Sequence, residues 1–173
     1  MIRVLADKYI YKIEELIPAE FELHLYDPIS HSNPDLSGFE AFLVRTVQKI
    51  NSDTYPVFPD SLRFIGTASS GRDHLDIEYI EHNQVSVKDS KGCNANAVAE
   101  YVVTALLIWA EKKYEILREL SVGIIGFGFI GAKVAEKLDR LGIAYKAYDP
   151  YLAEWDEDFK SCSLEEALGT DIL

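Results

Sequence analysis

The 173-residue sequence has few basic residues and almost no cysteine. Lysine and arginine number 17 against 29 aspartates and glutamates, and the formal net charge of −12 argues against a nucleic-acid partner, which would need a basic surface. The two cysteines, Cys93 and Cys162, lack the spacing of metal ligands, so we expect no metal site and a reducing, cytoplasmic setting. We expect Cys93 to be a small buried residue in a loop.

Long apolar runs are also missing. The most apolar stretch, residues 97–110, contains Glu100 and is shorter than the about 20 residues of a membrane-spanning helix, so we expect no membrane partner. The chain begins directly with the strand-like run Met1 to Leu5, and the pattern of a signal peptide is not visible. We interpret the acidic run Glu154 to Asp158 as solvated surface.

Residues 121–149 have the pattern of a strand, a glycine-rich turn, a helix and a second strand. Residues 122–125 form a short apolar run typical of a buried strand, and residues 130–141 place apolar side chains on one helix face. The second strand is expected at residues 144–148. It leads to Asp149, at about the 20-residue spacing from the glycines that is typical of a ribose-binding acid. The glycines follow the Gly-x-Gly-x-x-Gly pattern of dinucleotide-binding units; they are Gly126, Gly128 and Gly131.

Each part of this pattern has a role in holding a dinucleotide. Gly126 permits a tight turn, Gly128 lets a pyrophosphate approach the backbone, and Gly131 allows the helix to pack closely on the strand. The amino end of the helix attracts the phosphates. A glycine-rich turn in some other α/β unit is the alternative. We predict that the cofactor is NAD and that its binding residues are Gly126, Gly128, Phe129, Ile130, Gly131 and Asp149.

The first half of the chain predicts an α/β fold with a parallel sheet. We expect strands at residues 2–6, 21–26, 41–44, 63–67 and 85–88, and helices at residues 9–17 and 75–82. In such sheets ligands bind beyond the carboxyl ends of the strands. The polar groups expected there are Arg45, Thr46 and residues 67–71, which we interpret as candidate substrate contacts. A surface salt bridge for Arg45 and an ordinary turn for the serine-rich loop are the alternatives.

One long helix is expected over residues 94–120. Its first half is apolar nearly all round, so we predict that it is buried between layers. We expect three parts: a substrate domain at 1–94, an interdomain helix at 95–118 and an incomplete nucleotide domain at 119–173. Near the end, Ser163 and Glu166 should form a capping box on a helix at 164–168, and residues 171–173 should begin a further strand.

Three further stretches complete a resemblance to a known family. They are Val44 to Asn51, Phe64 to Asp76 and Gly92 to Tyr101. With the glycine pattern, they resemble the D-isomer-specific 2-hydroxyacid dehydrogenases over nearly the whole chain. The resemblance implies a flavodoxin-like parallel-sheet domain followed by the first part of a Rossmann domain, with the active site between two domains. It also implies hydride transfer between NAD and a phosphorylated 2-hydroxy acid, most closely 4-phosphoerythronate, and a homodimer.

The resemblance also implies roles for particular residues. Thr46 and Thr67 correspond to substrate-contacting residues and Asp149 to the ribose-binding acid. In this family the catalytic arginine, glutamate and histidine come later than residue 173, so we expect an N-terminal portion that is inactive alone. His74 is not a substitute for the catalytic histidine, and we interpret it as structural. The expected substrate contacts are Arg45, Thr46, Thr67, Ala68 and Gly71.

Two alternatives remain open at this point. One is an enzyme of the same family with another substrate, such as 3-phosphoglycerate. The other is a natural short chain that binds a dinucleotide or a partner without catalysis.

Overall fold

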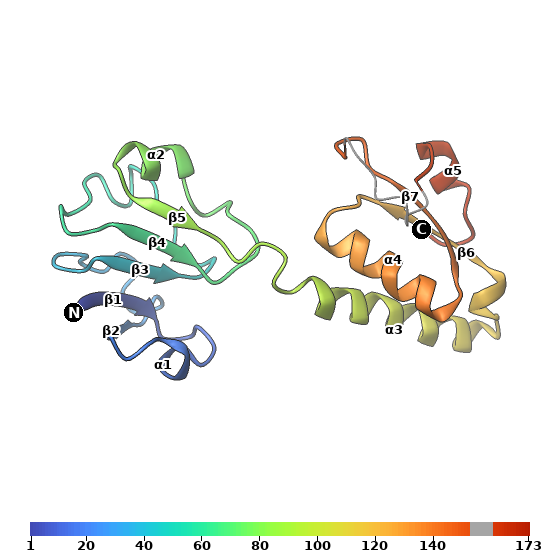
Figure 1. The fold of residues 1–173 in the computed structure, drawn as a ribbon, viewed down its shortest axis with the longest axis horizontal. Helices are drawn as coiled ribbons and strands as arrows, with labels where there is room; N and C mark the ends of the chain where they lie inside the picture. The colour runs from blue at the N-terminus through green and yellow to red at the C-terminus, as the bar shows by residue number, and fades with distance from the viewer. Residues whose placement is uncertain (153–160) are drawn as a thin grey trace. The chain divides into compact units, whose positions relative to one another are not determined.

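The computed structural model describes residues 1–152 and 161–173. It divides the chain into two compact units, Met1–Cys93 and Asn94–Leu173, and each contains a parallel sheet (Figure 1). The acidic run Glu154 to Asp158, predicted to be solvated, lies outside the described residues.

The first unit is built on five parallel strands in the order β2-β1-β3-β4-β5 (Figure 1). This is the flavodoxin-like order, in which the winding of the chain across the sheet reverses between β1 and β3. The predicted fold class is therefore confirmed, and the carboxyl ends of β1 and β3 lie side by side at this switch point. The strands are β1 (Ile2–Asp7), β2 (Phe21–Tyr26), β3 (Ala41–Val44), β4 (Phe64–Thr67) and β5 (Ser86–Lys88).

The helices of the first unit are shorter than predicted. The helix expected at residues 9–17 is reduced to α1 (Ile13–Leu16), because Lys12 adopts a left-handed conformation with φ of 54° and cannot continue a helix. Before it, the backbone N–H of Tyr9 donates to the Asp7 carboxylate, which fixes a turn after β1. The second helix, α2 (Ile77–His82), follows its N-cap residue Asp76, whose side chain accepts a hydrogen bond from the backbone N–H of Tyr79.

Part of the core of the first unit comes from the long loop between β3 and β4. Tyr55, Phe58 and Leu62 of this loop are buried, and the Tyr55 ring lies 6.1 Å from the ring of Phe42 in β3. Large aromatic side chains bury much apolar area, so packing rather than secondary structure fixes this loop. The loop begins directly after β3 with Arg45, and its packing therefore holds the candidate site.

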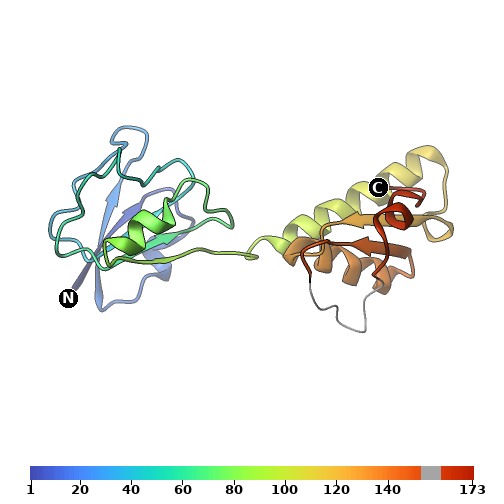
Figure 2. The ribbon, with the colours of Figure 1, turned by 90° about the horizontal axis from the view of Figure 1, so that it is seen from above.

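The second unit contains the predicted strand–helix–strand pattern. β6 (Ser121–Ile125) pairs in parallel with β7 (Ala144–Tyr148), and α4 (Phe129–Leu141) connects them. Val122 and Ile124 pack in one core cluster with α4, whereas the intervening Gly123 lies against α5 (Leu164–Leu168). Because successive strand residues point to opposite faces, α4 and α5 cover opposite faces of the strand pair (Figures 1 and 2).

The end of the chain follows the sequence prediction. Ser163 and Glu166 form the expected capping box at the start of α5, with the backbone N–H of Glu166 donating to Ser163 Oγ at 3.2 Å. Ile172 forms a parallel bridge with Val122 of β6. The predicted start of a further strand at residues 171–173 is therefore confirmed.

The predicted helix at residues 94–120 was wrong in its length and in its burial. α3 (Ala95–Lys113) ends at Tyr114, which is left-handed with φ of 57°, and a separate turn, η1 (Leu117–Glu119), precedes β6. Ala99, Val103 and Ala110 are buried in the core cluster that contains α4, whereas Trp109 is 40% exposed. The apolar composition overstated the burial, because within residues 1–152 and 161–173 only one side of α3 is covered.

Candidate functional site

The turn between β6 and α4 contains three glycines in different environments. Gly126 has φ of +93°, a conformation that a side chain would strain. Gly131 is buried, and a Cβ at this position would collide with the carbonyl oxygen of Gly126. Gly128 has ordinary extended geometry, and a Cβ built on it meets no atom within 4 Å. The fold itself therefore requires Gly126 and Gly131, whereas the space beside Gly128 is open to a ligand.

The amino end of α4 points its partial positive charge into this open space. Gly128 is the N-cap residue and supplies no side-chain oxygen to the first N–H groups of the 13-residue helix. Phe129 and Ile130, the first two helical residues, are 56% and 42% exposed. A helix terminus of this kind attracts anions, and the predicted cofactor-binding residues Gly128, Phe129 and Ile130 all lie at it.

Asp149 follows β7 and holds the same turn from its other side. Its Oδ2 accepts a hydrogen bond from the backbone N–H of Phe127 at 2.7 Å, and its Oδ1 accepts from that of Tyr151 at 2.9 Å. These backbone donors, first that of Phe127 and then that of Tyr151, lower the pKa of the Asp149 carboxyl below its usual value. The structure thus places an ionised, half-buried carboxylate next to the glycine turn.

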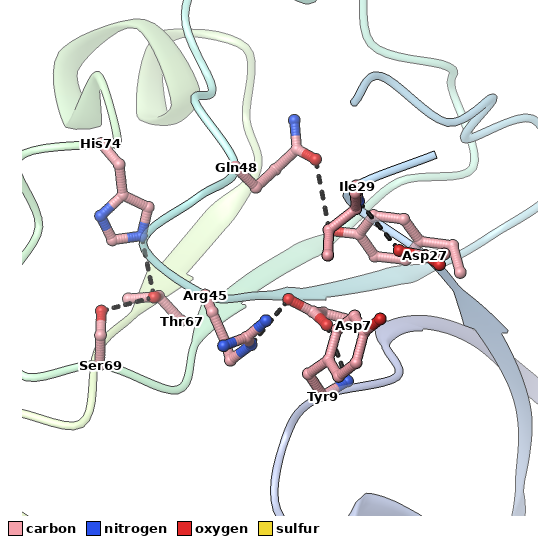
Figure 3. A network of polar contacts seen from close by, with 10 residues as sticks. Asp7, Tyr9, Asp27, Ile29, Arg45, Gln48, Thr67, Ser69 and His74 are labelled. Atoms are coloured by element: carbon pink, nitrogen blue, oxygen red, sulfur yellow. Dashed lines mark hydrogen bonds and ion pairs between the residues drawn. The ribbon is translucent and has the colours of Figure 1, made fainter. Parts of the chain in front are cut away.

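In the first unit, Arg45 is anchored at the switch point of the sheet. Its Nε donates to Oδ2 of Asp7 at 2.8 Å, and the Asp7 side chain is fully buried at the end of β1 (Figure 3). The guanidinium carbon lies 5.3 Å from the centre of the Tyr9 ring. Because the ion pair uses Nε, the two terminal nitrogens of Arg45 stay outside it, and the side chain is 33% exposed. The anchored fork suits a carboxylate or phosphate.

Thr67 lies at the same edge of the sheet, but its hydroxyl group is covered. Val44, the residue before Arg45, pairs with Thr67 across β3 and β4. Thr67 is only 3% exposed, and its Oγ1 lies 2.9 Å from His74 Nε2 and 2.8 Å from Ser69 Oγ (Figure 3). The interaction with His74 connects a residue that we interpreted as structural to a candidate substrate contact.

The other predicted contacts follow β3 and β4 directly. The backbone N–H of Ala68 donates to the carbonyl of Val44, so the two strands stay paired up to this residue. The structure thus brings the end of β3 and the loop after β4 to one edge, at which the side chain of Thr67 is buried. The exposed predicted residues there are Thr46, Ala68 and Gly71.

Sequence reasoning missed Asp7 and did not single out Ser69 within residues 67–71. The signal for Asp7 was present, because a charged residue ends the strand Ile2–Asp7, where a site residue belongs in a parallel sheet. Ser69 lies in the serine-rich loop that we noted, but nothing local distinguished it from Ser70. Only the folded chain shows that Ser69 contacts Thr67.

Other predictions concern metal, membrane and cysteine. Across residues 1–152 and 161–173, no cluster of histidine, cysteine, aspartate and glutamate could hold a metal ion. In the same residues, no helix combines the length and the apolar character needed to cross a membrane. Cys93 is exposed, so the prediction that it is buried was wrong. It lies in the turn that leads into α3.

The chain matches the model of one protein family along almost its whole length. The model describes the D-isomer specific 2-hydroxyacid dehydrogenase, catalytic domain, and it matches residues 4–168. The chain belongs to this family. The resemblance inferred from the motifs is therefore confirmed.

Several relatives of this chain are named erythronate-4-phosphate dehydrogenase. The protein of Legionella pneumophila (strain Philadelphia 1) is 36% identical over 172 residues, which cover 99% of this chain and 48% of the relative. The protein of Pseudoalteromonas atlantica is 35% identical over 167 residues, which cover 92% of this chain and 44% of the relative. The chain thus spans about half the length of the curated relatives that it matches.

Solved dehydrogenases share the fold. The D-lactate dehydrogenase of Aquifex aeolicus, solved with NAD and lactic acid, matches with a TM-score of 0.71 at 22% identity, over 96% of this chain and 57% of that chain. The NAD-bound 3-phosphoglycerate dehydrogenase of Entamoeba histolytica matches with a TM-score of 0.70 at 20% identity, over 96% and 59%. At these identities the likeness establishes the fold of this family member and not its substrate.

Proposed function

We propose that this chain is the N-terminal portion of an NAD-dependent oxidoreductase that transfers a hydride between NAD and a phosphorylated 2-hydroxy acid. The substrate that we propose is 4-phosphoerythronate, an intermediate of pyridoxal phosphate synthesis, and the full-length protein would be a homodimer. One observation supports the cofactor most directly. Gly128, the N-cap residue of α4, has open space where a Cβ would lie, and the ionised Asp149 accepts a hydrogen bond from the backbone N–H of the preceding residue, Phe127.

The NAD pyrophosphate would lie at the amino end of α4, against the backbone from Gly126 to Gly131. The adenosine ribose would donate its hydroxyl hydrogens to Asp149, which the two backbone N–H groups hold in place. A 2′-phosphate on that ribose would meet the negative charge of Asp149, and the next residues, Pro150 and Tyr151, supply no cation. This arrangement favours NAD over NADP.

The acid would bind in the first unit, at the carboxyl ends of β3 and β4. Arg45 would bind an anionic group of the substrate with its terminal nitrogens, because Asp7 holds Nε. Thr46 is exposed beside it, and Ala68 and Gly71 offer exposed backbone close to the end of β4. The names of the relatives support 4-phosphoerythronate, and the fold shared with 3-phosphoglycerate dehydrogenase keeps 3-phosphoglycerate as the alternative.

In this chemistry NAD supplies the carbon that accepts the hydride. The described residues bind and orient the two reactants. The family resemblance assigns the histidine that moves the hydroxyl proton, its glutamate and the arginine that holds the carboxylate to positions after residue 173. The 173 residues alone should therefore form no NADH above a no-enzyme control.

Titration of the 173-residue chain with NADH, followed by cofactor fluorescence, tests the cofactor site. Gly128→Val should abolish binding with little change in thermal unfolding, because a Cβ at this position has no protein atom within 4 Å and the side chain would enter the open space. Lys133→Gln, on the exposed side of α4, is the matched control and should bind as the parent chain does. Equal binding by Gly128→Val would contradict the proposed site.

A chain extended to the length of its relatives tests the substrate. NADH formation with 4-phosphoerythronate and with 3-phosphoglycerate should favour the first. Preference for the second acid would establish the alternative enzyme. Absence of turnover with both would favour the short dinucleotide-binding protein.

A further inference from the structure

The hydrogen bonds at the end of β4 have a direction that can be deduced by counting protons. Ser69 Oγ lies 2.9 Å from the carbonyl oxygen of Gly71, which can only accept, so Ser69 donates its single hydroxyl proton to Gly71. Ser69 Oγ also lies 2.8 Å from Thr67 Oγ1. Because the Ser69 proton is already used, Thr67 must be the donor in that contact.

The same count requires a proton on Nε2 of His74. Thr67 donates its only hydroxyl proton in the hydrogen bond to Ser69, so its Oγ1 must accept a hydrogen bond from His74 Nε2, 2.9 Å away. An isolated neutral imidazole can carry its proton on either nitrogen, and here the hydrogen bonds select Nε2–H. The chain of donors therefore runs from His74 through Thr67 and Ser69 to the carbonyl of Gly71.

The backbone around this chain of hydrogen bonds is held on both sides. The carbonyl of Thr67 accepts from Ser90 Oγ at 3.1 Å, and the backbone N–H of Ser90 donates to the carbonyl of Ser69. The carbonyl of His74 accepts from the backbone N–H of Ile50 at 2.9 Å, in the packed loop after β3. The imidazole and the two hydroxyl groups thus start from fixed positions.

Thr67 is 3% exposed, whereas Ser69 is half-buried and lies beyond the last paired residue of β4. An anionic oxygen is a stronger acceptor than a neutral carbonyl, and hydrogen bonds to charged acceptors are roughly twice as strong as neutral ones. Rotation of the Ser69 hydroxyl group can therefore redirect its hydrogen bond from the Gly71 carbonyl to a substrate anion at this edge of the sheet. Thr67 could donate to such an anion only by breaking its hydrogen bond to Ser69.

We propose that Ser69 is a further substrate contact, which donates its hydroxyl proton to an anionic oxygen of the acid, and that His74 is the positioning residue that orders this donor through Thr67. The inference rests on the proposed function for the identity of the acid. The direction of the hydrogen bonds stands independently of it.

Nitrogen-15 NMR of the imidazole groups in the 173-residue chain tests the direction. We expect the His74 signals of a neutral ring protonated on Nε2. A ring protonated on Nδ1 alone would reverse the deduced chain and overturn the proposal.

Titration of the same chain with inorganic phosphate and, separately, with glycolate tests the contact. Ser69→Ala and His74→Phe should both weaken binding of the same anion, phosphate or glycolate, by about tenfold. This is the size of a lost charge-assisted hydrogen bond. His74→Gln, which keeps an N–H donor at the reach of Nε2, should restore binding to within about threefold. Ser86→Ala, an exposed residue at the amino end of β5, is the matched control and should bind as the parent chain does.

The double variant Ser69→Ala, His74→Phe separates positioning from structural support. If His74 acts through Ser69, the double variant should bind no more weakly than Ser69→Ala alone. Additive losses, or unchanged binding of both anions by Ser69→Ala, would overturn the proposal. An extended chain that oxidises neither phosphorylated acid would refute the proposed function, while these binding results would still decide the roles of Ser69 and His74.

Discussion

Asp149 Oδ2 accepts a hydrogen bond from the backbone N–H of Phe127 at 2.7 Å, so the acid after β7 holds the turn that leads into α4. One carboxylate therefore stabilises the glycine turn and, in our proposal, binds the ribose of NAD. The fold and the cofactor preference depend on the same side chain, and its variants should affect both.

Asp149→Asn should change cofactor discrimination. The amide keeps one acceptor oxygen but loses the charge that repels a 2′-phosphate, so NADH should bind about tenfold more weakly and the preference over NADPH should fall toward one. Parallel fluorescence titrations of the 173-residue chain with NADH and NADPH measure this. A parent chain that binds both cofactors equally would refute the role of Asp149.

The same residue should make stability depend on acid pH. Backbone N–H groups of Phe127 and Tyr151 lower the pKa of Asp149 in the folded chain, below its unfolded value of about 3.9. A lowered pKa stabilises the fold above the unfolded value, and this stabilisation is lost as the pH falls through the folded value. The stability difference between the parent chain and Asp149→Asn should therefore shrink between pH 5 and about pH 2, measured by urea unfolding. A difference that stays constant over this range would exclude the linkage.

Replacement by alanine should destabilise the fold at one glycine of the turn and leave its stability nearly unchanged at another. In Gly131→Ala the new methyl group meets the backbone carbonyl of Gly126, which cannot rotate away, so we expect a loss of about 1–3 kcal/mol in unfolding free energy. Gly128→Ala adds a methyl group in open space and should stay within about 0.5 kcal/mol of the parent chain. Urea unfolding of both variants provides the comparison, and equal losses would show that close packing does not distinguish the two positions.

Local sequence patterns predicted the strands, the glycine turn and α4, because apolar periodicity and glycine spacing are properties of short segments. They missed the early end of α3, because the residues around Tyr114 give no sequence signal for its left-handed conformation. They also missed the partner of Arg45. Asp7 lies 38 positions away in the chain, and only the pairing of β1 with β3 brings the two side chains together.

The structure also separates two threonines that sequence reasoning treated alike. We expected both Thr46 and Thr67 to contact the substrate. Thr67 is buried and bonded to His74 and Ser69, so Thr67→Ala should lower the unfolding free energy by about 1–2 kcal/mol. Thr46→Ala, at an exposed position, should change it by less than about 0.5 kcal/mol. Urea unfolding of the chain gives the stabilities, and KM for 4-phosphoerythronate in an extended chain should rise in both variants. Equal stability losses would show that the contacts of Thr67 do not stabilise the fold.

The ion pair of Arg45 and Asp7 should contribute less to the free energy of unfolding than the loss caused by removing only one of the two charges. Arg45→Met leaves a fully buried carboxylate without its cation, and breaking such a pair typically costs about 3–5 kcal/mol. Because Arg45 is 33% exposed and water can reach its end of the pair, we expect a loss nearer 2 kcal/mol. The double variant Asp7→Asn, Arg45→Met removes both charges and should recover at least half of this loss, since no buried charge remains unpaired.

Arg45→Lys keeps the charge but not the fork, so it should retain most of the stability and still weaken binding of the substrate anion. Urea unfolding and phosphate titration of the three variants measure both effects. A double variant as unstable as Arg45→Met would show that packing of the arginine stem, and not its charge, stabilises this edge of the sheet.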